Sequence, residues 1–372
     1  MEDRYTTLHR HAGLVVAVLL GLVASGCRVA DPALFTYQNP NLELPFRDTH
    51  VVPDGGRFYA VGTSEPFWAG ANPGVKLYVS DDLREWSFVD LLIDAASLPD
   101  DVWYKDRFWA PELRRIGDRY YLTFNCQNNS GSYAEANPSH FHSVGLAAAD
   151  RIEGPYTVLT PDRPLVDFAS NDGSLFEDDD GRVYLFFNNG WTPLHHIFVA
   201  EIDLERAVLR EEPVRLISQE PGTWDGGGIE GAHVIRHEGV YYLFYSSWTR
   251  GYAVGYATAT NIRGPWTKYD RNPLFGAFRE EGQAFIYRDG EVVADAASPY
   301  QTVGHNQIFV GPDGRYWTSF HGYRAGVESP GMVMDPFWFE NGVIRTPAPT
   351  YTLQTVPVAP HMEREFPGLR RR

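Results

Sequence analysis

The hydrophobic pattern of the chain repeats. Short aromatic and aliphatic runs come in pairs separated by a polar turn, and this unit recurs five times, starting near residues 48, 109, 172, 230 and 305. Between β-rich runs, an acidic residue followed by glycine predicts a hairpin, because glycine accepts a positive φ. Four of the five turns have this pair: Asp54-Gly55, Asp180-Gly181, Glu238-Gly239 and Asp313-Gly314.

The spacing of the units predicts the architecture. A unit of about 60 residues holds four short strands with their turns. Four-stranded sheets repeated around an axis form a β-propeller. We therefore expect an all-β fold, a single five-bladed β-propeller over residues 39–356. Residues 27–38 are expected to be a linker and residues 357–372 a C-terminal tail.

The N-terminus is predicted to be a targeting segment. Residues 14–24 form an unbroken run of apolar residues and glycine. The run is too short for a bilayer-spanning helix, which needs about 20 residues, and it suits a signal peptide. It leads into Ala24-Ser25-Gly26-Cys27, which resembles a bacterial lipoprotein cleavage box. We expect residues 1–26 to be removed and Cys27 to carry a lipid that anchors the protein in the cell envelope. An ordinary secretory signal, giving a secreted or periplasmic protein, is the alternative.

Composition narrows the function. The chain of 372 residues has 32 Lys+Arg against 48 Asp+Glu, a formal net charge of −16. This acidity argues against nucleic acid as a partner, because phosphate neutralisation needs clustered cations. Two cysteines exclude a disulfide framework and a multi-cysteine zinc module, so Cys126 is expected to be a small buried side chain. Membrane contact is expected only through the anchor, and the oligomeric state is not predicted.

The repeat starts carry the candidate chemistry. Inner strands of a propeller line its central channel, so their entries ring one mouth. A purely structural repeat would place one residue type there, whereas this chain has Asp48, Trp109, Asp172, Glu230 and His305. Carboxylates that converge raise the pKa of at least one of them, which suits a base and an acid working together. Each carboxylate taken alone could equally be a turn or capping residue.

These motifs resemble glycoside hydrolase family 43, whose members are five-bladed propeller enzymes acting on arabinose-, xylose- and sometimes galactose-containing polysaccharides. The resemblance spans roughly residues 38 to 356. It is carried by Phe46-Arg47-Asp48-Thr49, Phe108-Trp109-Ala110-Pro111, Asn171-Asp172-Gly173, Glu230-Gly231-Ala232-His233 and Gly304-His305-Asn306. Thr49, Gly173 and Ala232 stand where the family usually has proline.

The resemblance implies roles for these residues. Asp48 matches the general base, Glu230 the general acid, and Asp172 the carboxylate that orients the acid and raises its pKa. The implied reaction is inverting hydrolysis by an α-L-arabinofuranosidase or β-D-xylosidase, or by a β-galactosidase-type enzyme. No cofactor is implied as a requirement, although in some members the residue matching His305 lies near a channel calcium.

Further residues are candidates for binding an oligosaccharide or polysaccharide substrate. We expect Trp109, Trp191, His305 and Arg324 to contact sugar. Trp68 and Trp248 could stack on sugar or pack between blades. Glu112 could be structural or part of a polar network. His321 is expected to be a core histidine.

Two other functions stay open. A carbohydrate-binding propeller without catalysis would keep the aromatic residues but need not keep both the acid and the base. A retaining five-bladed relative, such as a fructan hydrolase, would use an Asp nucleophile about 5–5.5 Å from the acid, whereas inverting enzymes hold the two carboxyls about 6.5–9.5 Å apart.

Overall fold

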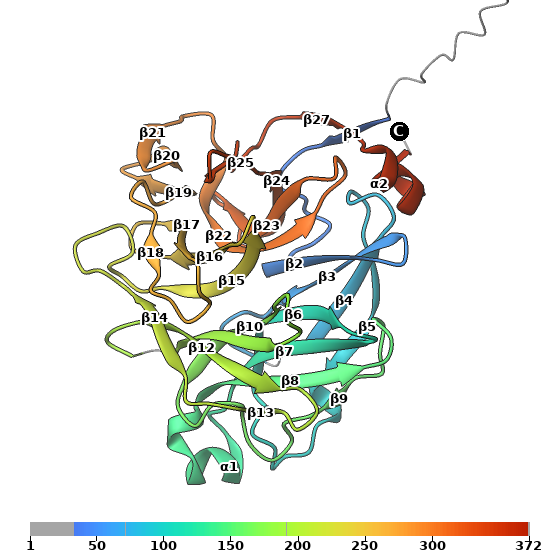
Figure 1. The fold of residues 1–372 in the computed structure, drawn as a ribbon, viewed down its shortest axis with the longest axis vertical. Helices are drawn as coiled ribbons and strands as arrows, with labels where there is room; N and C mark the ends of the chain where they lie inside the picture. The colour runs from blue at the N-terminus through green and yellow to red at the C-terminus, as the bar shows by residue number, and fades with distance from the viewer. Residues whose placement is uncertain (1–32, 71, 191, 371–372) are drawn as a thin grey trace, which may run out of the picture. The chain divides into compact units, whose positions relative to one another are not determined.

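The computed structural model describes residues 33–70, 72–190 and 192–370, in which antiparallel sheets follow one another around the molecule (Figure 1). The first two sheets have four strands each, paired in chain order. Their strands are β2 (Arg47–Asp54), β3 (Arg57–Thr63), β4 (Gly74–Ser80), β5 (Ser87–Asp94), β6 (Arg107–Ile116), β7 (Arg119–Gln127), β8 (His142–Ala149) and β9 (Thr157–Val158).

The third sheet has five strands, and the fourth and fifth units are joined into one sheet of ten. The third comprises β10 (Ser170–Glu177), β11 (Val183–Asn189), β12 (His196–Asp203), β13 (Val208–Leu209) and β14 (Val214–Ser218). The fourth unit comprises β15 (Glu230–His237), β16 (Val240–Ser247), β17 (Tyr252–Ala259) and β18 (Thr267–Lys268), and the fifth β22 (Tyr300–Val310), β23 (Tyr316–Arg324) and β24 (Gly331–Pro336).

An insertion joins the last two units. It comprises β19 (Phe275–Glu280), β20 (Gln283–Arg288) and β21 (Glu291–Ala294), and β19 pairs with both β17 and β22. This insertion accounts for the long final interval of the sequence repeat. The five sheet units confirm the predicted five-bladed, all-β propeller. Smaller elements are β25 (Trp338–Glu340), β26 (Val343–Arg345) and the one-and-a-half-turn helix α1 (Gly131–Ala136).

The core is divided among the five interfaces between neighbouring blades. Five large clusters of buried apolar side chains each draw from two successive blades. Between the third and fourth blades, for example, Phe186 and Ile197 pack with Val234 and Leu243. Because both faces of each blade are covered, strands such as β11 are buried along their whole length, and they read as continuous apolar runs.

The two ends of the described chain close the propeller. β1 (Leu34–Tyr37) pairs with β27 (Gln354–Pro357), and the two lie side by side in Figure 1. Asn41 exchanges two backbone hydrogen bonds with Met332 of β24, which ties the start of the domain to the fifth blade.

The expected linker and tail therefore need correction. The stretch 27–38 contains β1, and the stretch 357–372 contains helix α2 (Pro360–Glu365) and a 3₁₀ turn at Pro367–Arg370. Met362, Phe366 and Leu369 are buried between the first and fifth blades. Strand β1, helix α2 and the turn at Pro367–Arg370 are too short to show a repeat in sequence, and they fold because the blades supply an apolar surface.

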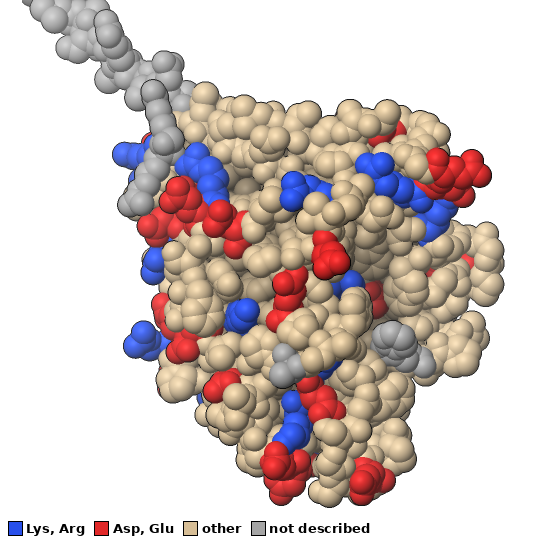
Figure 2. Space-filling model, turned by 180° about the vertical axis from the view of Figure 1, so that it is seen from behind, with Lys and Arg blue, Asp and Glu red and all other residues tan. Residues whose placement is uncertain are grey.

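The surface is mixed in charge. On the face shown in Figure 2, acidic and basic side chains lie interspersed over a mostly uncharged surface. Cys126 is buried, as predicted. None of the helices within the described residues has the length and apolar character needed to span a bilayer. The predicted signal peptide 1–26 and the lipid site Cys27 lie outside the described residues.

Candidate active site

A β-bulge near the entry of each inner strand shapes the site. The pairing register shifts at this point in all five inner strands. One residue within each shift has a positive φ, namely Asp48 (53°), Ala110 (38°), Asp172 (54°), Gly231 (65°) and His305 (56°). Such bulges re-aim side chains and occur beside active sites.

The bulges correct the equivalence assumed for the five repeat starts. Asp48, Asp172 and His305 share the bulge position, whereas Trp109 and Glu230 stand one residue before it. Glu230 thus leaves its strand from a different backbone position than the two Asp residues. This offset gives the acidic side chains different directions of approach to the same mouth.

The bulges also join the blades. Their backbone N–H groups point away from the local ladder and reach side chains of the preceding blade. Four such bonds occur: Ala110 to Thr63 Oγ1 (2.7 Å), Gly231 to Asp172 Oδ2 (3.0 Å), His305 to Ser246 Oγ (3.0 Å) and Asp48 to His321 Nδ1 (3.1 Å).

All five blades contribute to one cavity of about 720 Å³ at this mouth. Of the residues expected from sequence, Asp48, Trp109, Asp172, Glu230 and His305 line it. Arg324 is not among the described lining residues, whereas His321 and Tyr323 of the same strand β23 line the cavity, since successive side chains of a strand point to opposite faces. Trp191 lies outside the described residues.

Asp48 is held as a carboxylate. Its Oδ2 accepts a hydrogen bond from Thr63 Oγ1 at 2.6 Å, and His305 Nδ1 lies 3.3 Å from its Oδ1. Burial by itself raises the pKa of Asp48, but the positive charges of His305 and Arg47 outweigh it and hold that pKa well below its usual range. An ionised carboxylate is the form that can act as a base.

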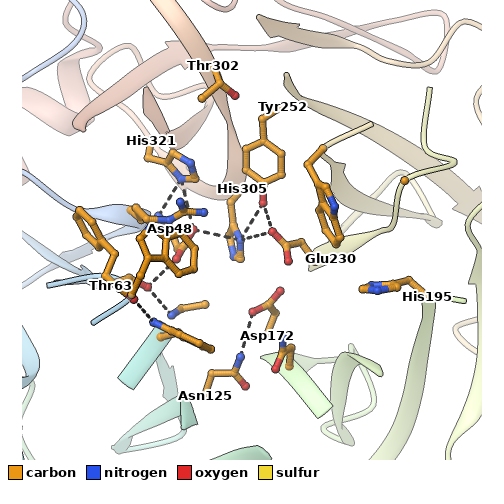
Figure 3. Close-up of a pocket in the computed structure, with 18 of the residues that line it drawn as sticks. Asp48, Thr63, Asn125, Asp172, His195, Glu230, Tyr252, Thr302, His305 and His321 are labelled. Carbon is orange, nitrogen blue, oxygen red and sulfur yellow. Dashed lines mark hydrogen bonds and ion pairs between the residues drawn. The ribbon is translucent and has the colours of Figure 1, made fainter. Parts of the chain in front are cut away.

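His305 lies at the centre of the site. Its Nδ1 is 3.3 Å from Asp48 Oδ1 and 3.9 Å from Glu230 Oε1, and Figure 3 shows it between these two carboxylates. Burial disfavours the imidazolium, but Asp48, Asp172 and Glu230 raise the pKa of His305 to about 10. A cation at this point offsets part of the negative charge that the three carboxylates concentrate in the cavity.

The pKa of Glu230 differs from the expectation, which was that burial and Asp172 would raise it. The hydroxyl of Tyr252 donates a short hydrogen bond to Glu230 Oε1. Burial raises the pKa of Glu230, but His305 and Tyr252 together lower it below its ordinary value. The pKa increase that was expected for Glu230 occurs at Asp172 instead. Burial and the charges of Glu230 and Asp48 raise the pKa of Asp172 to about 7. Near neutral pH this coupled pair of carboxyls therefore holds a proton.

The same group has the composition of a metal site. One ligand atom each from Asp172, Glu230 and His305 lie within 4.8 Å of one another, so these residues could hold a metal ion. Metal binding at a histidine requires the neutral ring. A metal would therefore have to displace the proton that the carboxylates hold on His305.

A second polar cluster lies along the inner strands. Ser174 Oγ donates to Glu112 Oε2 at 2.7 Å, and His233 Nδ1 lies 3.5 Å from the same oxygen. Glu112 is buried and does not line the cavity. Of the two interpretations of Glu112, the polar network is thus the one that the structure shows.

Several cavity residues were not identified from sequence as part of the site. They are Arg47, Thr63, Asn125, Tyr252 and His321, which line the cavity with the expected residues. His321 was expected in the core, and it is buried, but its Nδ1 accepts the N–H of Asp48. Arg47 directly precedes Asp48, which is a usable sequence signal. The others lie on β3, β7, β17 and β23, so only folding brings them to the mouth.

Comparison with known proteins gives the site a context. A sequence profile of glycosyl hydrolases family 43 matches residues 37–342. The chain is 32% identical over 221 residues to a putative beta-xylosidase of Escherichia coli (strain K12), covering 57% of this chain and 38% of that protein. It is 25% identical over 316 residues to a beta-D-galactofuranosidase of Aspergillus niger, covering 82% of this chain and 79% of that protein.

Solved structures of this family have a similar fold. A thermostable family-43 glycoside hydrolase superposes with a TM-score of 0.70 at 26% identity, covering 87% of this chain and 99% of that one. This chain spans only about two-fifths of the length of the Escherichia coli protein and of a xylosidase/arabinosidase of Humicola insolens. Because the family profile matches well over half of the chain, and the fold and cavity agree with it, this protein belongs to glycosyl hydrolases family 43.

Proposed function

We propose that this chain hydrolyses glycosidic bonds with inversion of configuration and releases a terminal xylose or arabinofuranose. The observation that carries the proposal is the placement of Asp48 and Glu230 on opposite sides of His305 in one cavity (Figure 3). The names of the relatives, a putative beta-xylosidase and a xylosidase/arabinosidase, support this choice of sugar. A β-galactosidase-type activity is the second choice.

The two carboxyl groups have different roles in the reaction. Glu230 donates its proton to the glycosidic oxygen as the bond to the anomeric carbon breaks. Asp48 takes a proton from a water molecule, whose oxygen bonds to that carbon from the opposite face. The distances of 3.3 Å and 3.9 Å from His305 Nδ1 put Asp48 Oδ1 and Glu230 Oε1 no more than 7.2 Å apart, their sum. This limit includes both the retaining separation of about 5–5.5 Å and the lower part of the inverting range, so the anomer of the first product distinguishes the two mechanisms.

The neighbouring groups set the protonation states. Asp172 holds a proton within 4.8 Å of Glu230, and because the two carboxyls titrate as a pair, that proton is available to the acid. His305 and Arg47 keep Asp48 ionised. The Glu230 side chain is 21% exposed against 8% for Asp48, so the acid is the carboxylate more open to the cavity.

The cavity is large enough to receive a sugar. Residues from all five blades line it, among them Thr63, Trp109, Asn171, Tyr252 and Tyr323. Trp109 is held by a hydrogen bond from its Nε1 to the Phe67 carbonyl at 3.0 Å, so its indole is a fixed wall for the bound sugar.

Release of chromophore from aryl α-L-arabinofuranoside, β-D-xyloside and β-D-galactoside tests the proposal. Wild-type protein should hydrolyse one of them, and Glu230→Gln and Asp48→Asn should each lose a factor of about 10² or more. Asp118→Asn changes a fully exposed carboxylate and serves as the matched control.

The alternatives give different results in the same experiment. NMR of the first product anomer separates inversion from the retention expected of a fructan-hydrolase-like mechanism. Absence of release from any aryl glycoside or polysaccharide, combined with sugar binding, would favour the non-catalytic propeller.

The cellular location is a proposal from sequence. The box Ala24-Ser25-Gly26-Cys27 supports lipid attachment at Cys27 and a place in the cell envelope. Labelling with a radioactive fatty acid in a bacterial host should mark the wild type but not Cys27→Ala. Label on both proteins, or on neither, would contradict the anchor and favour a secreted or periplasmic form.

A structural calcium near His305 is a further part of the proposal. Within the described residues, the buried Nε2 of His305 has no hydrogen-bond partner, and neither do the buried oxygens Thr49 Oγ1 and Asn306 Oδ1 on the inner strands. Oxygen donors suit calcium. Bound there, the ion would tie the inner strands together. Elemental analysis should find one calcium per chain, and chelation should lower the unfolding temperature; a metal-free protein that is insensitive to chelator would refute it.

A further inference from the structure

The direction of the leaving group is set by the acid. Because Glu230 protonates the leaving oxygen in the function proposed above, on which this inference rests, the departing group must lie on the Glu230 side of the bound sugar. Asp48 and its water occupy the opposite side. Figure 3 shows His195 beyond Glu230, on the side away from Asp48. The question is therefore what surface this side of the cavity offers.

That surface is an exposed indole. Trp248 lines the cavity with His195, and 37% of it is exposed. The two rings meet edge to face, with centroids 5.2 Å apart. Trp248 lies over Gly228, which has φ 138°, and a Cβ at that glycine would lie 2.3 Å from the indole. Only a glycine at position 228 leaves room for the Trp248 indole, and this glycine lies two residues before Glu230.

The loop beneath the indole is firmly held. Gly227 N donates to Thr249 Oγ1 at 2.7 Å, which links the loop to the residue after Trp248. Gln219 Nε2 donates to the Gly226 carbonyl at 2.8 Å. At the base of the loop, buried Asp225 pairs with Lys268 Nζ at 2.7 Å. An aromatic face held rigidly loses little conformational entropy on binding, which favours a binding platform.

A second exposed indole lines the cavity with a different partner. Trp68 is 61% exposed, and the Arg47 guanidinium stacks over it at 4.7 Å. Arg47 directly precedes Asp48, so this indole belongs to the side of the base.

We propose that Trp248, which packs over Gly228 and contacts the edge of His195, forms the subsite for the sugar that leaves. The substrate is then a glycoside whose leaving group is itself a sugar, an oligosaccharide or polysaccharide chain end. The apolar face of a sugar ring stacks on the indole, and its hydroxyls remain in water. Simple alkyl glycosides would gain nothing from this subsite.

Two donors with the same terminal sugar and anomeric configuration test the subsite. One is the disaccharide of the sugar identified with the aryl glycosides. The other is the glycosyl fluoride, whose leaving group is a single atom that has no ring to stack. In Trp248→Ala the ratio of kcat/KM for disaccharide to that for fluoride should fall about 10- to 100-fold. Trp248→Phe should restore most of the ratio, and Trp68→Ala, the matched control, should leave the ratio as in the wild type.

The outcomes are distinct. An unchanged ratio in Trp248→Ala, whether both rates fall together or neither falls, would overturn the subsite while the glycosidase function stands. A fall of the ratio in Trp68→Ala instead would place the leaving group against Trp68. Wild-type protein that hydrolyses neither donor would overturn the proposed function and this inference with it.

Discussion

Phe366→Ala tests whether the C-terminal segment is part of the propeller. Phe366 follows helix α2, is 2% exposed, and stacks on Phe58 of β3 with ring centroids 4.5 Å apart. Removing a buried phenylalanine side chain costs about 3–5 kcal/mol of the free energy of unfolding. With an unfolding entropy of about 2.1 cal/mol/K per residue over roughly 340 folded residues, the melting temperature should fall by about 4 to 7 °C.

Thermal unfolding followed by calorimetry measures this change, and Arg364→Ala is the matched control because its side chain in the same helix is exposed. Hydrolysis at 25 °C should stay within about twofold, since Phe366 lies away from the cavity residues. If Phe366→Ala melts within 1 °C of both the wild type and the control, the segment is a solvated tail and the packing argument is wrong.

Three further predictions concern the site. Tyr252→Phe removes the hydroxyl that stabilises the Glu230 carboxylate, so the pKa of Glu230 should rise and the alkaline limb of the kcat/KM profile should move to higher pH; an unmoved limb would contradict the role of Tyr252. Gly231→Ala should cost about 1–2 kcal/mol in urea unfolding, because φ is 65° and the new Cβ would lie 3.3 Å from the His305 ring; wild-type stability would refute this. The pKa of His305 is raised to about 10, so the stability it contributes below pH 6.5 should be lost as pH rises through 10. The Asp48→Asn variant should lose less stability over that range. An equal loss would show that the ion pair of Asp48 with His305 is not responsible.

The sequence alone was enough for the architecture and for three of the central residues. Short aromatic runs with Asp-Gly turns at regular intervals are a local signal, because strand period and turn chemistry depend on neighbouring residues. The repeat then points to Asp48, Asp172 and Glu230 as residues that break its uniformity. A repeated position filled by different polar residues is visible without any coordinates.

Sequence did not give the relative placement of these residues. Aligning Glu230 with Asp48 and Asp172 is off by one, because the equivalent bulge position in the fourth blade is Gly231. The available sequence signal of this offset was Gly231, the glycine that directly follows Glu230. The consequence is chemical, since this offset places Glu230 beside Tyr252 and His305, which lower its pKa against expectation.

What the sequence by itself determined is the repeating unit, the number of blades and the identity of the acidic residues. What only the tertiary structure decided is which groups surround them: Tyr252 and His321 arrive from strands β17 and β23, and Trp248 from the loop after β16. The physical reason is the difference in sequence separation between the residues that interact. Strand formation is governed by residues a few positions apart, whereas the charge on a buried carboxyl depends on every group within several ångströms, whatever its distance along the chain.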